Sequence, residues 1–294
     1  MELQILGDNC QYIEDLKTLF RVCFQESEEA IRCFFEHRFQ KENCVVLIKD
    51  YKVVSALYLL ETRILLEGKL ISAYYLYAAA TLPEYQGRGY MRKLIAFSNT
   101  VAAARGWQYS VLLPANEGLY HYYKQSGYQK WYATRVVTIT SKEMKKYVGA
   151  PKEQSNTFSF DKMYQVRFNI CGNLGGSVIW DEKAIEYACL LSDVYRGKTI
   201  FSNDGYALCS PVWNGVVTIT EFMVQRSGFS ELMGEIFRSF PDVCYRFRMP
   251  VSSPYFKGQG EVLPFGMVKP LHDDKGLLIE MQKDSVPYLG LTLD

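Results

Sequence analysis

Along the first half of the chain, hydrophobic and polar residues follow the periodicity of helices in some segments and that of strands in others. Apolar side chains recur at helical spacing within residues 13–24 and 28–39, and Asn9 is the expected N-cap of the first helix. Runs rich in β-branched and aromatic residues predict four strands, at residues 2–6, 44–49, 53–66 and 70–81. Because only short turns separate the last three runs, the pattern indicates an antiparallel meander.

The pattern then changes to a strand, a glycine-containing loop and a helix. The loop at residues 83–89 follows the fourth strand, and a helix with one apolar face is expected from Tyr90 until Gly106. Three further elements follow: a strand at 109–113, a short helix at 116–126 and a long strand at 128–140. Since backbone N–H groups at a helix start attract anions, the loop and helix together predict phosphate-binding geometry.

The second half of the chain begins after a polar segment. Residues 141–161 combine lysines, Pro151 and a Gln-Ser-Asn-Thr cluster, which is typical of a helical turn and linker. The elements expected beyond it are a strand at 163–171, a helix at 181–195, strands within 198–223, a helix at 229–240 and a strand at 243–249. Asn214-Gly215 is a strong hairpin signal. A second α+β unit is therefore predicted.

Composition and charge exclude several classes of protein. The 33 Lys and Arg residues nearly balance the 32 Asp and Glu residues, so no strong field favours nucleic acid or anionic lipid. The longest stretch without a charged residue, 205–220, is shorter than the roughly 20 residues of a membrane-spanning helix. The N-terminus has neither a basic nor a long apolar region, which leads us to expect a cytoplasmic protein without a secretory signal.

The spacing of the cysteines and histidines does not match that of a metal site. The eight cysteines are scattered without a C-x-x-C pair, which favours reduced thiols, mostly in the core. The three histidines are not spaced three or four residues apart. We therefore expect no metal cofactor.

The glycine loop and the short helix after it carry the candidate chemistry. Gly87 and Gly89 permit positive φ and leave room for a ligand, and Arg88 and Arg92 are cationic. Taken alone, the run also fits an ordinary tight turn. However, residues 79–94 closely resemble the coenzyme A motif of the GNAT superfamily of N-acetyltransferases, Q/R-x-x-G-x-G/A. A second GNAT motif, N-x-x-A-x-x-x-Y-x-x-x-G-F/Y, is matched at the corresponding spacings by Asn116, Leu119, Tyr123, Gly127 and Tyr128.

The resemblance implies a fold, a co-substrate and a set of site residues. The implied fold is the α/β (α+β) GNAT fold, a mixed, mostly antiparallel twisted sheet flanked by helices, and the implied co-substrate is acetyl-CoA. The residues implied to bind the coenzyme are Ala79, Ala80, Thr81, Gln86, Gly87, Arg88, Gly89, Tyr90, Met91, Arg92 and Asn116. By the same resemblance, the backbone of residues 79–81 splays from its neighbouring strand and bonds the pantetheine, residues 87–92 hold the pyrophosphate, and Asn116 contacts the pantetheine arm.

Tyr123 takes the position of the family's general acid, which protonates the departing thiolate. A phenol of pKa about 10 is well matched to a thiol of about 8.5. Tyr123 also fits a plain core tyrosine beside Tyr120 and Tyr122. Two departures from the family stand out: Met91 replaces the commoner Gly or Ala, and the strand at 72–77 carries no carboxylate to act as base. No base is assigned, and a water relay or a remote carboxylate stays open.

An internal similarity at an offset of 139 residues indicates a second, degenerate copy. Gln86-Gly87-Arg88-Gly89 falls on Gln225-Arg226-Ser227-Gly228, while the position equivalent to Tyr123 is Val262. We expect a catalytic GNAT domain at 1–141, a linker at 142–162, a degenerate GNAT-like domain at 163–271 and a C-terminal tail at 272–294. This tandem order resembles the Eis-type acetyltransferases without their complete sterol-carrier-like domain. Members of that type use the terminal carboxylate as base, and the tail that would deliver Asp294 is short here.

The leading functional hypothesis is acetyl transfer from acetyl-CoA to a primary amine, on a small molecule or a peptide, by direct attack in a ternary complex. Another tandem transferase, similar to mycothiol synthase or the Fem-type enzymes, is an alternative. A coenzyme-A-binding sensor or scaffold without turnover is a third hypothesis. Neither nucleic acid nor membrane is an expected partner. The sequence predicts neither the acceptor nor the oligomeric state.

Overall fold

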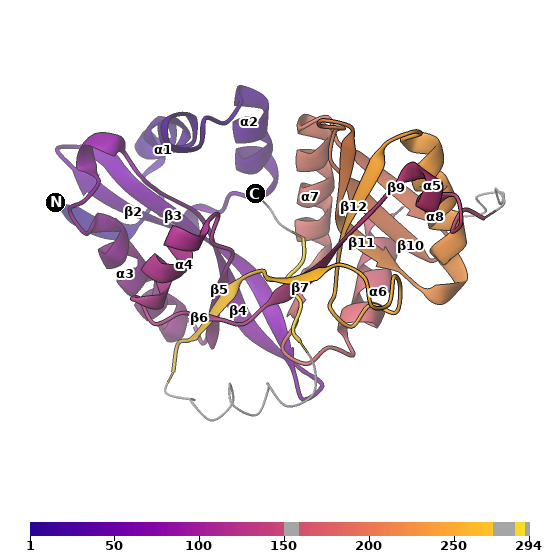
Figure 1. Cartoon of the computed structure of the whole chain (residues 1–294). Coiled ribbons are helices and arrows are strands. Elements are labelled where there is room, and N and C mark those ends of the chain that lie inside the picture. The colour runs from indigo at the N-terminus through magenta and orange to yellow at the C-terminus, as the bar shows by residue number, and fades with distance from the viewer. Residues whose placement is uncertain (150–158, 273–285, 292–294) are drawn as a thin grey trace. The chain divides into compact units, whose positions relative to one another are not determined.

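The computed structural model describes residues 1–149, 159–272 and 286–291, and these residues form two compact units (Figure 1). The first unit contains Met1–Ile64, Ile71–Lys130 and residues 266–272. The second contains Leu65–Leu70, Trp131–Phe265 and residues 286–291. Each unit is thus assembled from segments that are distant in the sequence, whereas the expected domains at 1–141 and 163–271 are contiguous.

The first unit is built on a mixed sheet with the strand order β1-β2-β3-β4-β5-β14-β6. Its strands are β1 (Glu2–Ile5), β2 (Cys44–Lys49), β3 (Lys52–Leu66), β4 (Lys69–Thr81), β5 (Tyr109–Leu112), β6 (Gln129–Lys130) and β14 (Met267–Pro270). Strands β1, β2 and β3 pair antiparallel, and β4 is the next neighbour, which confirms the predicted meander. Both turns of the meander use left-handed residues, at 50–51 and 67–68, as tight hairpins of right-handed strands require.

Four α-helices accompany this sheet: α1 (Ile13–Leu19), α2 (Glu28–His37), α3 (Tyr90–Ala104) and α4 (Glu117–Lys124). The helix expected at 13–24 continues past α1 as a π-helical turn, η2 (Phe20–Phe24). Asn9 precedes a short 3₁₀ turn, η1 (Cys10–Tyr12), and its side chain caps no helical N–H group. Its Nδ2 instead donates to the carbonyl of Leu6 at 3.0 Å, so the expected N-cap is wrong.

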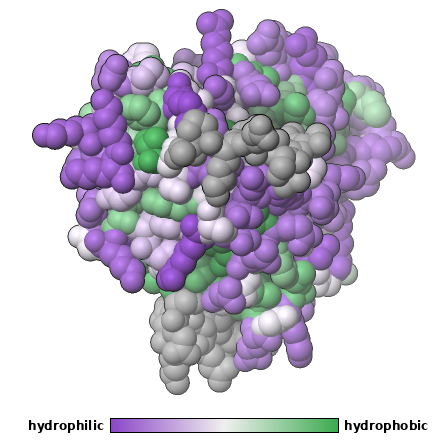
Figure 2. All heavy atoms as spheres, turned by 90° about the vertical axis from the view of Figure 1, so that its right-hand side faces the viewer, coloured by the Kyte–Doolittle hydropathy of each residue, from purple (hydrophilic) through white to green (hydrophobic). Residues whose placement is uncertain are grey.

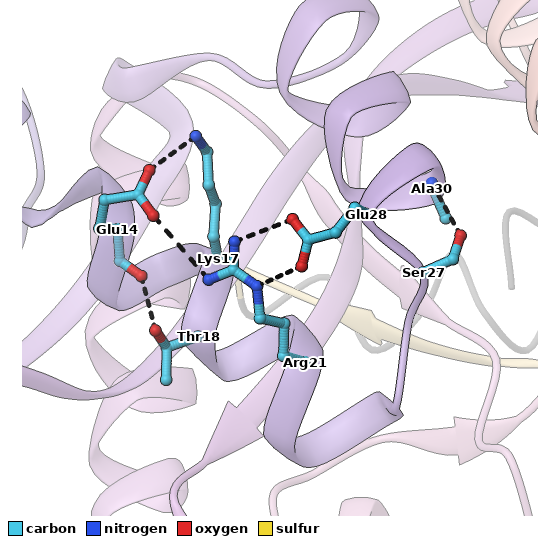
Figure 3. A network of polar contacts seen from close by, with 7 residues as sticks. All are labelled: Glu14, Lys17, Thr18, Arg21, Ser27, Glu28 and Ala30. Carbon is cyan, nitrogen blue, oxygen red and sulfur yellow. Dashed lines mark hydrogen bonds and ion pairs between the residues drawn. The ribbon is translucent and has the colours of Figure 1, made fainter.

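A polar network closes the corner between η2 and α2 (Figure 3). Arg21 donates to both carboxylate oxygens of Glu28, at 2.5 and 3.0 Å, while Glu14 accepts from Lys17 at 2.8 Å. Ser27 caps α2 by accepting the N–H of Ala30 at 3.1 Å. These contacts are exposed and add little stability, but they fix the direction in which the chain enters α2.

The second unit is built on a six-stranded sheet with the order β13-β7-β12-β11-β10-β9. Its strands are β7 (Ala133–Ile139), β9 (Lys198–Ser202), β10 (Gly205–Cys209), β11 (Val216–Val224), β12 (Cys244–Met249) and β13 (Glu261–Pro264). Its helices are α5 (Ser141–Met144), α6 (Phe160–Cys171), α7 (Glu182–Val194) and α8 (Phe229–Ser239). A two-stranded pair joins β8 (Val178–Ile179) to the end of β3. Hydrophilic side chains cover most of the face seen in Figure 2.

Two expected strands differ from the structure. Residues 163–171 form the helix α6, because Met163, Val166, Arg167 and Cys171 are buried at helical spacing after an N-cap at Ser159. Residues 128–140 form two strands in different sheets, since β6 pairs with β14 whereas β7 pairs with β12 and β13. In both cases the deciding partner is distant in the sequence.

The second unit repeats one strand–helix–strand arrangement of the first. In the first unit, β4 and β5 are parallel neighbours joined through α3, and in the second β11 and β12 are parallel neighbours joined through α8. The helix starts Tyr90 and Phe229 are separated by the predicted offset of 139 residues. The internal similarity therefore coincides with a repeated arrangement of two parallel strands joined through a helix.

A buried polar network anchors the segment 286–291 inside the second unit. The Glu221 carboxylate lies 3.3 Å from Arg167 Nη1 and accepts bonds from the Tyr288 hydroxyl and the Leu291 N–H, both at 2.9 Å. Arg167 Nη2 also donates to the carbonyl of Leu289 at 2.9 Å. Both charged side chains are almost completely buried, so each depends on the other for its charge to be compensated.

Replacing Glu221 with glutamine should lower the free energy of unfolding by about 3–5 kcal/mol, because it leaves the Arg167 charge buried without its counterion. Denaturant titration followed by circular dichroism measures this change. The matched control is Glu28→Gln at the exposed pair with Arg21, which should barely move the midpoint. Equal midpoints for Glu221→Gln and the parent protein would show that Arg167 does not depend on this counterion.

Candidate functional site

The site begins where β4 leaves its neighbour in the first unit. Parallel pairing of β4 with β5 joins residues 73–75 to residues 109–111, and β4 continues to Thr81 whereas β5 ends at Leu112. Ala78 lies between Tyr75, the last residue of β4 that pairs with β5, and Thr81, the last residue of β4. It adopts a left-handed conformation with φ +45°, which is uncommon for a residue with a Cβ and bends the strand. The backbone at 79–81 thus extends beyond the paired part of the two strands.

The loop after β4 opens the N-terminus of α3. Gly87 and Gly89 have φ of +73° and +72°, and a Cβ added to either would meet no atom within 4 Å. Gly89 is the N-cap of α3, no side chain caps the helix, and its first turn contains no acidic residue. Because the first N–H groups of a helix lack intrahelical acceptors, this end presents donors and positive potential to the open space.

A cavity of about 570 Å³ collects most of the predicted site residues. The residues that line it are Ala79, Thr81, Tyr85, Gln86, Gly87, Gly89, Tyr90, Met91, Arg92, Leu119, Tyr122 and Tyr123. The loop, the start of α3 and one face of α4 therefore meet in one place. Met91 also packs against the core of this unit, which shows how the helix start accommodates a longer side chain.

Three predicted coenzyme-binding residues do not line this cavity. Ala80 is buried, and its carbonyl accepts from the Ser55 hydroxyl at 2.8 Å. Arg88 donates to the carbonyl of Glu84 at 2.9 Å. Asn116 is the N-cap of α4 and accepts the N–H of Leu119 at 3.1 Å. Each thus has a local structural contact, and its role toward a coenzyme stays a prediction.

Tyr123 is both a core residue and a cavity residue. Its side chain is 8% exposed and belongs to the hydrophobic cluster of the first unit. The rings of Tyr122 and Tyr128 lie edge-on at centroid distances of 5.4 and 5.8 Å. These neighbours hold the phenol in a fixed orientation beside the open helix end, so the two interpretations of this tyrosine are compatible.

Tyr85, Leu119 and Tyr122 line the cavity, although the sequence assigns none of them a role in the site. Leu119 lies one helical turn before Tyr123, so helical spacing alone indicates that both share a face. Tyr122 is half-buried; burial raises the pKa of its phenol, and the nearby Arg92 guanidinium partly offsets this. The guanidinium of Arg88 lies over the ring of Tyr85, 5.3 Å from the ring centroid.

The electrostatics of the cavity favour an anion. Arg92 is the charged residue among its lining residues, and its Nη2 donates to Gln125 Oε1 at 3.0 Å, which holds the guanidinium beside α4. No lining residue of this cavity is Asp, Glu or His. The lining can therefore bind an anion and donate a proton, whereas a base has to come from elsewhere. Asp294 lies outside the described residues.

In the second unit, the loop before α8 is the equivalent of the glycine loop, and packed side chains cover the start of this helix. The ring of Tyr255 stacks on Phe229 at 4.1 Å, and the Tyr255 hydroxyl donates to the carbonyl of Val224 at the end of β11. The first turn of α8 contains the buried Glu231, and a Cβ at Gly228 would lie 2.9 Å from Asp204. An acidic residue and packed rings thus replace the open donors found at α3.

Other site types find no support in the described residues. No group of three or more His, Cys, Asp or Glu side chains gathers there in a way that could hold a metal ion. All eight cysteines are free thiols, and most are buried. No helix in the described part of the chain has the length and hydropathy needed to cross a membrane.

Comparisons with known proteins agree with this geometry. Residues 9–130 match the family model described as acetyltransferase (GNAT) domain. No curated protein matches the sequence significantly. Among solved structures, a GCN5-related N-acetyltransferase from Anabaena variabilis ATCC 29413 is 14% identical with a TM-score of 0.73, over 92% of this chain and 73% of that one.

Two further structures are each similar over 92% of this chain. Eis1 from Mycobacterium abscessus is 10% identical with a TM-score of 0.68, over 74% of its own chain. A tandem GNAT protein from the clavulanic acid biosynthesis pathway is 10% identical with a TM-score of 0.52, over 99% of its chain. At such identities the likeness establishes the fold. Residues 9–130 are accordingly a GNAT N-acetyltransferase domain, an enzyme domain of the acyltransferase class, within a chain that has the fold of tandem GNAT proteins.

Proposed function

We propose that the first unit transfers an acetyl group from acetyl-CoA to a primary amine by direct attack in a ternary complex. The observation that carries the proposal is the cavity of about 570 Å³ in which the uncapped start of α3 and the Tyr123 side chain meet. The start of α3 can bind the diphosphate of a coenzyme, and the hydroxyl of Tyr123 can protonate a leaving group.

The open loop fits a diphosphate. A Cβ placed on Gly87 or Gly89 would have no protein atom within 4 Å, so phosphate oxygens can approach the backbone N–H groups of 87–92. Arg92 would add a cation at the same end. The backbone at 79–81 extends beyond its pairing with β5, which suits an extended pantetheine arm beside it.

In the proposed reaction, the neutral acceptor amine attacks the thioester carbonyl, the carbon–sulfur bond breaks and the thiolate leaves. Tyr123 would donate its hydroxyl proton to the sulfur, which raises the rate by roughly 10²- to 10⁴-fold. The amine's surplus proton must pass to water or to a carboxylate beyond the cavity lining. Holding both reactants in place would supply most of the remaining acceleration.

The acceptor is proposed to be a small molecule or a peptide that carries an amine. A net charge of +1 offers no reason to expect nucleic acid, and the cytoplasmic location stays a prediction. Neither the acceptor's identity nor the assembly state of the chain enters the proposal. A mycothiol-synthase-like reaction, which uses the second half, is disfavoured because the equivalent loop there is closed by Tyr255 and Glu231.

A Gly87→Ala variant should weaken the binding of coenzyme A about tenfold or more, because the added methyl group fills the approach to the loop amides. The left-handed φ should also cost about 1–2 kcal/mol of stability. Isothermal titration calorimetry and thermal melting measure the two effects. Gly175→Ala is the matched control, since its Cβ meets open space without a left-handed φ. Equal affinity of the two variants would overturn the assignment of the loop.

A Tyr123→Phe variant should lower turnover by about 10²-fold while the dissociation constant for coenzyme A stays unchanged. Thiol release in the presence of a panel of amines measures the turnover. Tyr122→Phe is the control, because this tyrosine lines the same cavity without the proposed role. If both variants keep the parent turnover, Tyr123 is not the acid.

The same assay separates the enzyme from a sensor or scaffold. The lining residues lack a base, which is the observation that keeps a role without turnover as the second candidate. Tight coenzyme binding without thiol release for any amine would favour the sensor, whereas release that depends on one amine would identify the enzyme and its acceptor class.

A further inference from the structure

A second cavity, of about 560 Å³, lies on the second unit, far in sequence from the glycine loop. Its lining comes from β7, β12 and β13 with the residue on either side of β13, and it includes Thr138, Arg246, Arg248, Glu261 and Phe265. None of these residues belongs to the site proposed above. The cavity is as large as the one beside α3, which is about 570 Å³.

The cavity lies on the sheet face opposite α8. Tyr245, Phe247 and Met249 of β12 belong to the hydrophobic cluster that includes α8. Successive side chains of a strand point to opposite faces, so Arg246 and Arg248 point away from that cluster. The same alternation places Thr138 of β7 on the cavity face, between the clustered Val137 and Ile139.

Hydroxyl groups flank the first arginine in register. Arg246 pairs with Thr138 on β7 and with Thr218 on β11, so a threonine stands on each side of it across the sheet. Arg246 is exposed, and within the described residues it forms no ion pair. Of the two threonines, Thr138 lines the cavity, so its hydroxyl and the Arg246 guanidinium offer O–H and N–H donors to one ligand.

The interior strand β12 presents two positive charges on the cavity face. Arg246 and Arg248 are two residues apart on one face, which puts their Cα atoms roughly 7 Å from one another. The guanidinium of Arg248 lies over the ring of Phe265, 5.5 Å from its centroid, so the cavity wall orients it. Glu261, the acidic lining residue, is in the same cross-strand row as Arg248, because both pair with Val136 of β7, so the lining contains two cations and one anion. The cationic side of the cavity is therefore complementary to an anion.

We propose that this cavity binds a small molecule bearing phosphate or carboxylate groups, held by Arg246 and Arg248 with help from the hydroxyl of Thr138. Arginine recognises both kinds of oxyanion through its planar fork of donors. An oxyanion between the two guanidinium groups relieves their mutual repulsion. No residue lines both this cavity and the one beside α3, so this inference does not rest on the proposed acetyl transfer.

The test uses pyrophosphate and citrate as probes, one for each kind of oxyanion, titrated calorimetrically into the full chain. Because pyrophosphate can also bind beside α3, the parent protein for this experiment carries Gly87→Ala together with Arg92→Gln, which block the loop amides and remove the cation there. We expect saturable binding with a dissociation constant at or below about 1 mM. Adding Arg246→Gln and Arg248→Gln together should weaken it at least about tenfold, and Thr138→Val should weaken it a few-fold.

The control is Arg238→Gln, which removes an arginine paired with Glu235 on α8 and should leave binding unchanged. Binding of pyrophosphate alone would identify a phosphate-bearing ligand, and binding of citrate alone a carboxylate-bearing one. The proposal is overturned if neither probe saturates by about 10 mM, or if the double variant binds both as well as its parent. Unchanged melting temperatures show that the variants are folded.

Discussion

The open N-terminus of α3 is the constraint on which the proposed chemistry depends. Left-handed glycines at 87 and 89 let the chain turn from β4 into the helix without a side chain over the loop. No side chain caps the first turn, so its N–H groups need another acceptor. The early end of the pairing between β4 and β5 leaves an extended backbone beside the same opening. Together these features make one end of the first unit suited to a long, anionic, thioester-bearing ligand.

The second unit shows what happens when the same topology loses that opening. Arg135 of β7 is buried and donates to the carbonyls of Tyr255 and Phe256, at 2.6 and 2.8 Å, which ties the loop after β12 to β7. The ring of Tyr255 then covers Phe229, and Glu231 occupies the first helical turn. One chain thus contains two related arrangements of strand, loop and helix, and only in the first are the helix donors left open to a ligand.

Local patterns predict the geometry of the glycine loop more closely than they predict some of the individual helices and strands. The glycine loop and the face that includes Tyr123 follow from motifs within a few residues, because the left-handed glycines and helical spacing are local requirements. The helix α6 replaces an expected strand, and its buried Arg167 is compensated by Glu221, which lies far along the chain. The division of residues 128–140 depends on β14, a strand from residues 267–270, which no local pattern reveals. The cavity beside Arg246 likewise arises only when β7, β12 and β13 are brought together.

Hydrogen–deuterium exchange of the main-chain amides tests the central claim most directly. If the diphosphate binds at the open helix end, coenzyme A slows exchange at residues 87–92, whereas pantetheine, which lacks the diphosphate, leaves these amides unprotected. The equivalent amides at 226–231 should exchange at the same rate with and without coenzyme A, because Tyr255 and Glu231 close that loop. Unchanged exchange at 87–92 under saturating coenzyme A, or protection that appears at 226–231 instead, would contradict the account.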